Sequence, residues 1–125
     1  MAYEIQVNRQ NHRVEARYWD RVDAEELHRA FGEIVACTKA SQIWHVLLDL
    51  SAMTGGHTLF DLHAIGKQLA GLPLSPRFRE AIVLPRSPDL ATHAKFWQSF
   101  CRANDFKVRN FGDRESAEAW LQSQH

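Results

Sequence analysis

The sequence predicts an α/β fold with a mixed, mostly parallel five-stranded sheet and four helices, in the order ββαβαβαβα. Three observations lead to this prediction. Two segments near the N-terminus alternate apolar and polar residues, which is typical of strands with one covered face. Two later apolar runs have almost no polar positions, as expected for inner parallel strands that are covered on both faces. Segments with apolar residues at helical spacing separate the strands, and this alternation favours parallel strands joined by helices.

The N-terminal third of the chain is expected to form a hairpin followed by a helix. Residues 3–18 contain two alternating runs, which flank a polar turn at 8–12. Asp23 and Glu26 resemble a capping box at a helix start. The apolar residues that follow recur at helical spacing, so a helix is predicted from about Ala24 to Thr38.

The rest of the chain repeats a strand and a helix three times. Each predicted strand is a short apolar run, and each predicted helix carries an apolar stripe. The predicted strands are residues 43–50, 80–85 and 106–111, and the predicted helices contain the stripes at 62–72 and 90–101 and the segment 114–122 after Asp113.

Length and charge narrow the classes of function. A chain of 125 residues suits a single domain, 1–125. Fifteen Lys and Arg balance fifteen Asp and Glu, so no net field would draw the chain to nucleic acid or anionic lipid. No apolar stretch reaches the roughly 20 residues that span a bilayer, and the N-terminus lacks the apolar core of a signal peptide. Cys37 and Cys101 fit buried thiols in a reducing compartment. We therefore expect a cytoplasmic protein with no membrane span and no nucleic-acid partner.

The segment that follows the third strand is the candidate site, because reactive groups gather beyond the carboxyl ends of parallel strands. A glycine pair there is expected to let the strand turn into the next helix. Thr58 and Asp61 have the spacing of a capping box, so the Thr58 hydroxyl is expected to cap that helix. A phosphate on Thr58 would be tolerated at the positive end of the helix dipole. The candidate loop and partner surface comprises Asp49, Gly55, Gly56, His57, Phe60 and Asp61.

The same segment leaves a catalytic alternative open. Asp49, Ser51, His57 and Asp61 supply a potential acid, nucleophile and base, although a triad is defined by geometry and not by nearness in sequence. A hydrolase would use Ser51 or Thr58 with His57. No G-x-S-x-G elbow, P-loop or G-x-G-x-x-G motif is present, so we expect no enzymatic activity and assign no catalytic residue. His57 and His63 are six residues apart, which does not match the spacing of a zinc-binding helix. We expect no metal and no cofactor.

Two further stretches carry a resemblance to a known family. "LLDLS" ends the third predicted strand, and "FKVRNFGDRESAEAWL" lies near the C-terminus. With the alternation of elements, they resemble the STAS superfamily, and within it the SpoIIAA-like subgroup of small bacterial proteins, over nearly the whole chain. The anti-sigma factor antagonists of this subgroup carry a phosphorylatable Ser in an Asp-Ser pair at the start of the second helix, and the resemblance implies a corresponding position in this chain. That pair falls on His57 and Thr58 here, so Thr58 is the first candidate phosphoacceptor and Ser51 is the second.

The second predicted helix is more apolar around its circumference than the first, because Leu59 and Phe60 add to its core stripe. The loop at 71–78, a partner protein or second copy, or a small apolar ligand could account for these residues. The leading interpretation is a non-enzymatic regulatory or protein-interaction module of the STAS type, which could respond to phosphorylation. The alternatives are a carrier of a small apolar ligand or lipid and an uncharacterised hydrolase.

Overall fold

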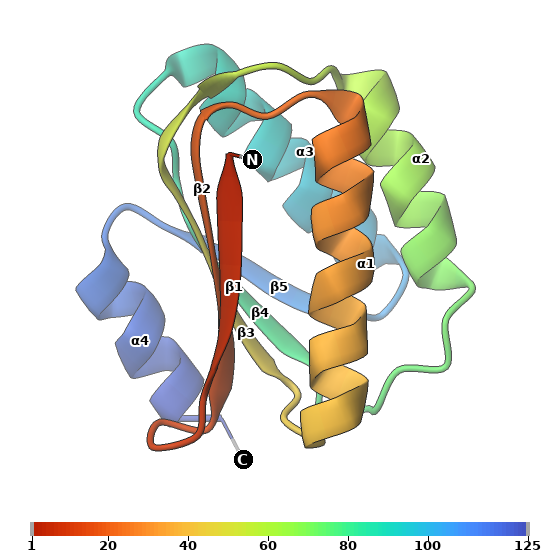
Figure 1. Ribbon diagram of the computed structural model, residues 1–125, viewed down its shortest axis with the longest axis vertical. Coiled ribbons are helices and arrows are strands. Elements are labelled where there is room, and N and C mark those ends of the chain that lie inside the picture. Colours follow the sequence, from red (N-terminus) through yellow and green to blue (C-terminus); the bar gives the residue numbers. More distant parts are fainter. Residues whose placement is uncertain (1, 125) are drawn as a thin grey trace.

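The computed structural model describes residues 2–124, which form one sheet with helices on both faces (Figure 1). The elements follow the order ββαβαβαβα, as the sequence predicts. The strands are β1 (Tyr3–Asn8), β2 (Arg13–Arg21), β3 (His45–Gly55), β4 (Arg79–Val83) and β5 (Lys107–Phe111), and the helices are α1 (Ala24–Ser41), α2 (Leu59–Ala70), α3 (Pro88–Ala103) and α4 (Arg114–Gln122).

The strands lie in the sheet in their order along the chain, β1-β2-β3-β4-β5. β1 pairs with β2 in antiparallel orientation, and the remaining neighbours pair in parallel. This confirms the mixed, mostly parallel sheet, and it places β1 at an edge. Helices α1, α2 and α3 cover one face of the sheet, whereas α4 lies alone on the other face (Figure 1).

Each face of the sheet has its own apolar core. The larger core lies under α1, α2 and α3, and β2 contributes alternate residues such as Val14, Ala16 and Tyr18 to it. Alternation along a strand sends the intervening side chains to the opposite face. The smaller core, under α4, contains Leu47, Ala81, Val83, Ala117 and Leu121.

A network of charged side chains lies beside this smaller core. Arg13 and Glu15 of β2 are only 5% and 9% exposed. Arg13 donates hydrogen bonds to Glu15 at 2.6 Å and to Glu118 of α4 at 2.8 Å, and Arg114 donates to Glu15 at 3.0 Å. Burial raises the pKa of Glu15, yet hydrogen bonds and the charges of both arginines outweigh burial and hold it below its ordinary value. These charge-assisted bonds attach α4 to β2.

β3 is longer than the sequence predicts. The apolar run predicts a strand at 43–50, whereas β3 extends from His45 to Gly55. The extra residues pair with the end of β2, where Trp19 lies opposite Ala52 after a shift in register. The residues after Leu50 are not a continuous apolar run, so their strand conformation depends on the neighbouring strand, which pattern alone does not reveal.

The junction between β3 and α2 requires glycine at position 56. Gly55 and Gly56 have φ angles of 150° and 110°, which residues other than glycine rarely adopt. The backbone N–H of Val22 donates to the carbonyl oxygen of Gly55 at 2.8 Å. A Cβ atom on Gly56 would lie 2.4 Å from the carbonyl oxygen of Val22, which is too close for any contact. Backbone therefore passes directly against backbone where the chain leaves the sheet.

We expect Gly56→Ala to lower the free energy of unfolding by about 2 kcal/mol or more, because the new Cβ meets both an unfavourable φ and the Val22 backbone. Gly32 is a matched control, since it lies in α1 and a Cβ there has no neighbour within 4 Å. Gly32→Ala should stabilise the protein by about 0.5 to 1 kcal/mol through helix propensity. Urea unfolding of both variants measures the difference, and equal effects would contradict the proposed constraint.

Candidate functional site

The start of α2 has the capping geometry that the sequence predicts. The Thr58 hydroxyl oxygen accepts a hydrogen bond from the backbone N–H of Asp61 at 3.2 Å. The Asp61 carboxylate accepts one from the backbone N–H of Thr58 at 2.8 Å, which completes a capping box. Thr58 is exposed, so its hydroxyl lies at the surface of the molecule while it caps the helix.

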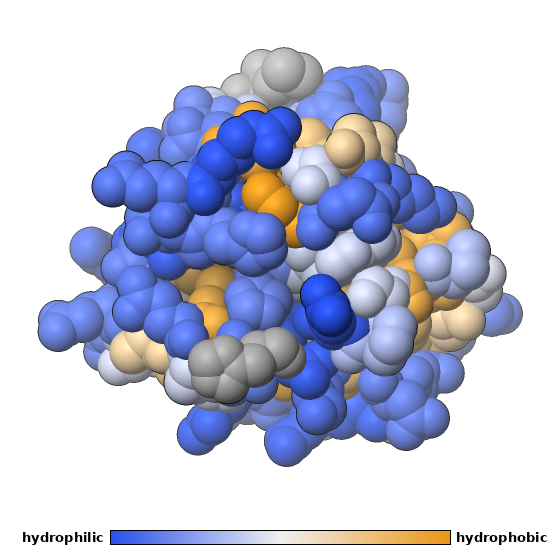
Figure 2. Space-filling view, turned by 90° about the horizontal axis from the view of Figure 1, so that it is seen from below, coloured by the Kyte–Doolittle hydropathy of each residue, from blue (hydrophilic) through white to orange (hydrophobic). Residues whose placement is uncertain are grey.

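Two large apolar side chains follow Thr58 on the first turn of α2. Phe60 is 80% exposed and Leu59 is 41% exposed. We call Thr58, Leu59 and Phe60 the α2 tip. The opposite end of the molecule, seen from below in Figure 2, is mainly hydrophilic, and its apolar residues lie in separate patches. Within residues 2–124, Leu59 and Phe60 are the large apolar residues that are exposed, so the apolar surface that they form is local.

Asp49 and Ser51 lie on the other face of the sheet from the cavity described below. The Ser51 hydroxyl donates to the Asp49 carboxylate at 2.6 Å, and the other oxygen of that carboxylate lies 3.6 Å from a guanidinium nitrogen of Arg114 in α4. His57, in contrast, lines the cavity under α1, α2 and α3. The structure thus separates Asp49 and Ser51 from the His57 imidazole, so these three residues do not form a triad.

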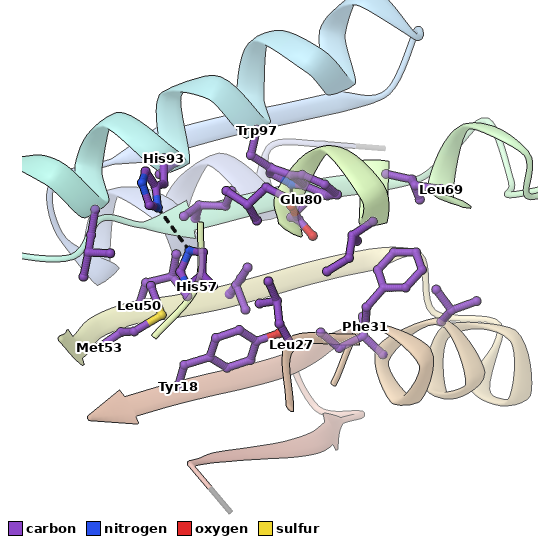
Figure 3. A pocket seen from close by; sticks show the side chains of 18 of the residues that line it. Tyr18, Leu27, Phe31, Leu50, Met53, His57, Leu69, Glu80, His93 and Trp97 are labelled. Atoms are coloured by element: carbon purple, nitrogen blue, oxygen red, sulfur yellow. Dashed lines mark hydrogen bonds between the residues drawn. The ribbon is translucent and has the colours of Figure 1, made fainter. Parts of the chain in front are cut away.

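A mainly apolar cavity of about 80 Å³ lies between the sheet and α1, α2 and α3 (Figure 3). Its walls come from β2, β3, β4 and the three helices, with Phe31 on α1, Met53 on β3 and Leu69 on α2 among them. Half-buried lining residues, including Phe31 and Leu62, bring the cavity close to the surface between α1 and α2. The inner side of the apolar α2 helix therefore faces a cavity, and this is the site that sequence reasoning did not locate.

Close packing of α2 on α3 forms the roof of the cavity. Gly66 of α2 is buried, and a Cβ atom there would lie 2.5 Å from the ring of Phe100 in α3. The His63 ring packs edge-on against the same phenylalanine, with ring centres 5.6 Å apart. Glycine thus brings the two helices together. Leu62, Ile65 and Leu69 on α2 line the cavity.

A single carboxyl group projects into this apolar space. Glu80 of β4 is 7% exposed, and the indole N–H of Trp97 donates to its Oε1 atom at 2.7 Å (Figure 3). Within residues 2–124, neither Oε2 of Glu80 nor the hydroxyl of Tyr18, which also lines the cavity, has a hydrogen-bond partner. Burial raises the pKa of Glu80 to about 7, against the opposing effect of the Trp97 hydrogen bond. The cavity therefore contains unused hydrogen-bonding capacity.

Two histidines from different elements meet at one end of the cavity. The His57 Nε2 atom lies 3.4 Å from Nδ1 of His93 in α3, and their rings are arranged edge to face (Figure 3). Burial and the nearby His93 lower the pKa of His57, and the Asp61 charge opposes them. Within residues 2–124, no group of three or more His, Cys, Asp or Glu side chains is arranged to hold a metal ion. The pair thus adds polar groups to the cavity wall.

We expect Glu80→Gln to stabilise the protein more at pH 8 than at pH 5. The pKa of the Glu80 carboxyl rises from 4.5 to about 7 on folding, so wild-type stability falls as the pH rises between these values and the penalty is complete above pH 7. Glutamine can still accept from Trp97 but never ionises, so its advantage at pH 8 should be roughly 3 kcal/mol. Denaturant unfolding at both pH values measures the change. The exposed Glu115→Gln variant is the control, and an equal pH dependence in both variants would contradict this assignment.

Comparison with known proteins supports the fold. No family model matches the chain, and no curated protein matches its sequence. Among helices of residues 2–124, none has the length and apolar character required to cross a bilayer. The structure is similar to that of an uncharacterized protein of the DUF3478 family from Shewanella loihica PV-4, described as having a SpoIIAA-like fold, with a TM-score of 0.61 and 16% sequence identity. The match covers 96% of this chain and 93% of that chain, so the chain has the SpoIIAA-like fold that the sequence resemblance implies.

Proposed function

We propose that this protein is a non-enzymatic STAS-type module that binds a small, mainly apolar ligand between its sheet and helices. The cavity with its single buried carboxyl group is the observation that supports the proposal. An apolar pocket with a few convergent polar groups and a shifted pKa is the usual form of a small-molecule site. The separation of Ser51 from His57 favours binding without catalysis.

The size of the cavity limits the ligand. At about 80 Å³ it is smaller than the engineered cavity of 150 Å³ that takes up benzene in another protein. A ligand larger than a few heavy atoms therefore requires the walls to adjust. Met53 in the wall has a flexible side chain that can adapt to different shapes. A small molecule that enters between α1 and α2 fits these limits.

Xenon, which enters dry apolar cavities, tests the proposal. We expect xenon to shift the methyl NMR signals of lining residues such as Leu69 and Ile82 in the wild-type protein. Leu62→Trp should raise the dissociation constant for xenon at least about tenfold, because the indole fills space at the half-buried edge of the cavity. Native mass spectrometry of freshly purified protein would then identify the natural ligand.

Leu59→Trp is the matched control for this experiment. Leu59 lies on the same helix and is 41% exposed, outside the set of cavity residues. The control should bind xenon as the wild-type protein does. Xenon shifts confined to surface methyl groups, or equal binding by both tryptophan variants, would overturn the proposed function.

The α2 tip supports a second candidate function, which is contact with a protein partner, most simply a second copy of the chain. The 80% exposure of Phe60 is the observation that favours it. Phe60 is the most exposed residue of the predicted surface, whose other members are half-buried: Asp49, Gly55, Gly56, His57 and Asp61. A phosphate on Thr58 would place about −1.5 to −2 charges beside the phenyl ring and oppose an apolar contact. Ser51 is a poorer phosphoacceptor, because its half-buried hydroxyl is bonded to Asp49.

Sedimentation equilibrium measures this second candidate. We expect Phe60→Ala and Thr58→Asp to weaken self-association at least about tenfold while changing the free energy of unfolding by less than about 0.5 kcal/mol. Aspartate caps helices as well as threonine does, whereas the control Thr58→Ala should lose about 1 kcal/mol of stability and retain association. A wild-type protein that stays monomeric at high concentration would exclude the second copy as the partner.

A further inference from the structure

We propose that the ligand of the cavity is a small, neutral, apolar molecule with one hydroxyl group, and that this hydroxyl is bound by the carboxyl group of Glu80. The inference rests on the proposed function and specifies the chemical class of its ligand. Three features of the cavity lead to it: no Lys or Arg among residues 2–124 lines its wall, Oε2 of Glu80 is free, and the Glu80 residue is buried.

The charge of the wall excludes anions. Among residues 2–124, the side chains that line the cavity include no Lys or Arg, and Glu80 is the acidic one. A carboxylate ligand would lose its hydration without gaining a counter-charge, and it would lie near a second carboxyl group. Burial and the nearby His93 lower the pKa of His57, which disfavours a positive charge on that ring. Fatty acid anions and phosphates therefore do not match this site.

The hydrogen-bonding state of Glu80 favours a hydroxyl group. The indole N–H of Trp97 already donates to Oε1 of Glu80, so a ligand would form its hydrogen bond with Oε2. With a pKa of about 7, the carboxyl group at neutral pH is a mixture of a form that accepts through Oε2 and a form that can donate from it. A hydroxyl group can donate to the first form and accept from the second. A carbonyl group pairs with the protonated form alone.

Burial disfavours an ammonium group at the same position. A cation would pair with ionised Glu80, but both charges would have to lose their hydration in a mainly apolar cavity. The attraction within such a buried pair is often no larger than the cost of desolvation. A neutral hydroxyl group avoids this cost and still satisfies Oε2. The unpartnered hydroxyl of Tyr18 in the same wall offers a further neutral contact.

NMR titrations with 1-butanol, butanoate and butylamine test the ligand class at equal chain length. We expect 1-butanol to shift the indole N–H signal of Trp97 and to bind at least about tenfold more tightly than either charged analogue. Its affinity should change less than about threefold between pH 6 and pH 8. Glu80→Met should weaken 1-butanol binding at least about fivefold, whereas Glu80→Gln, which can donate and accept, should keep it within about threefold.

The outcomes separate this inference from the proposed function. Tighter binding of butanoate or butylamine, or an unchanged affinity for 1-butanol in both Glu80 variants, would overturn the ligand class while xenon still occupied the cavity. Failure of both xenon and 1-butanol to reach the lining residues would overturn the cavity proposal itself. If Glu80→Met does not fold, the comparison of Glu80→Gln with the three probes and two pH values still decides the class.

Discussion

The close approach of Gly56 to the backbone of Val22 is the constraint on which the candidate site depends. It fixes the point at which the chain leaves the sheet after β3 and crosses the end of β2. Two residues later, the Thr58 hydroxyl begins α2. Because no side chain fits between the two backbones, the path of the chain there is set by steric exclusion, and both His57 at the cavity and Phe60 at the surface owe their positions to it.

The face above the sheet combines tight and loose packing. α2 is held against α3 through Gly66, and its inner side faces a cavity instead of a fully packed core. A buried carboxyl group in that cavity costs stability, as does every unfilled space near it. Features that cost stability without a structural benefit are typical of functional sites. Here the buried carboxyl group and the unfilled space occur in the same place.

The elements were predictable because their signals are local. Alternation in β1 and β2, apolar stripes in the helices and the spacing of Thr58 to Asp61 are each read within a dozen residues. The cavity was not predictable, because Glu80, Trp97 and Leu62 come from three elements and meet only in the fold. One signal was available: an inner strand is covered on both faces, so the carboxyl group of Glu80 had to be buried, and it shares the phase of Ile82, which faces the larger core.

The two faces of the sheet differ in how their helices are held. Apolar contacts hold α1, α2 and α3, whereas α4 combines a small apolar core with an ionic network to β2 that is formed by Arg13, Glu15, Arg114 and Glu118. The pKa of Glu15 lies below its ordinary value. Acidification through this pKa protonates Glu15 and removes its charge from the network that attaches α4 to β2. Acid therefore weakens the ionic attachment of α4 to β2 and leaves the small apolar core to hold this helix on the sheet.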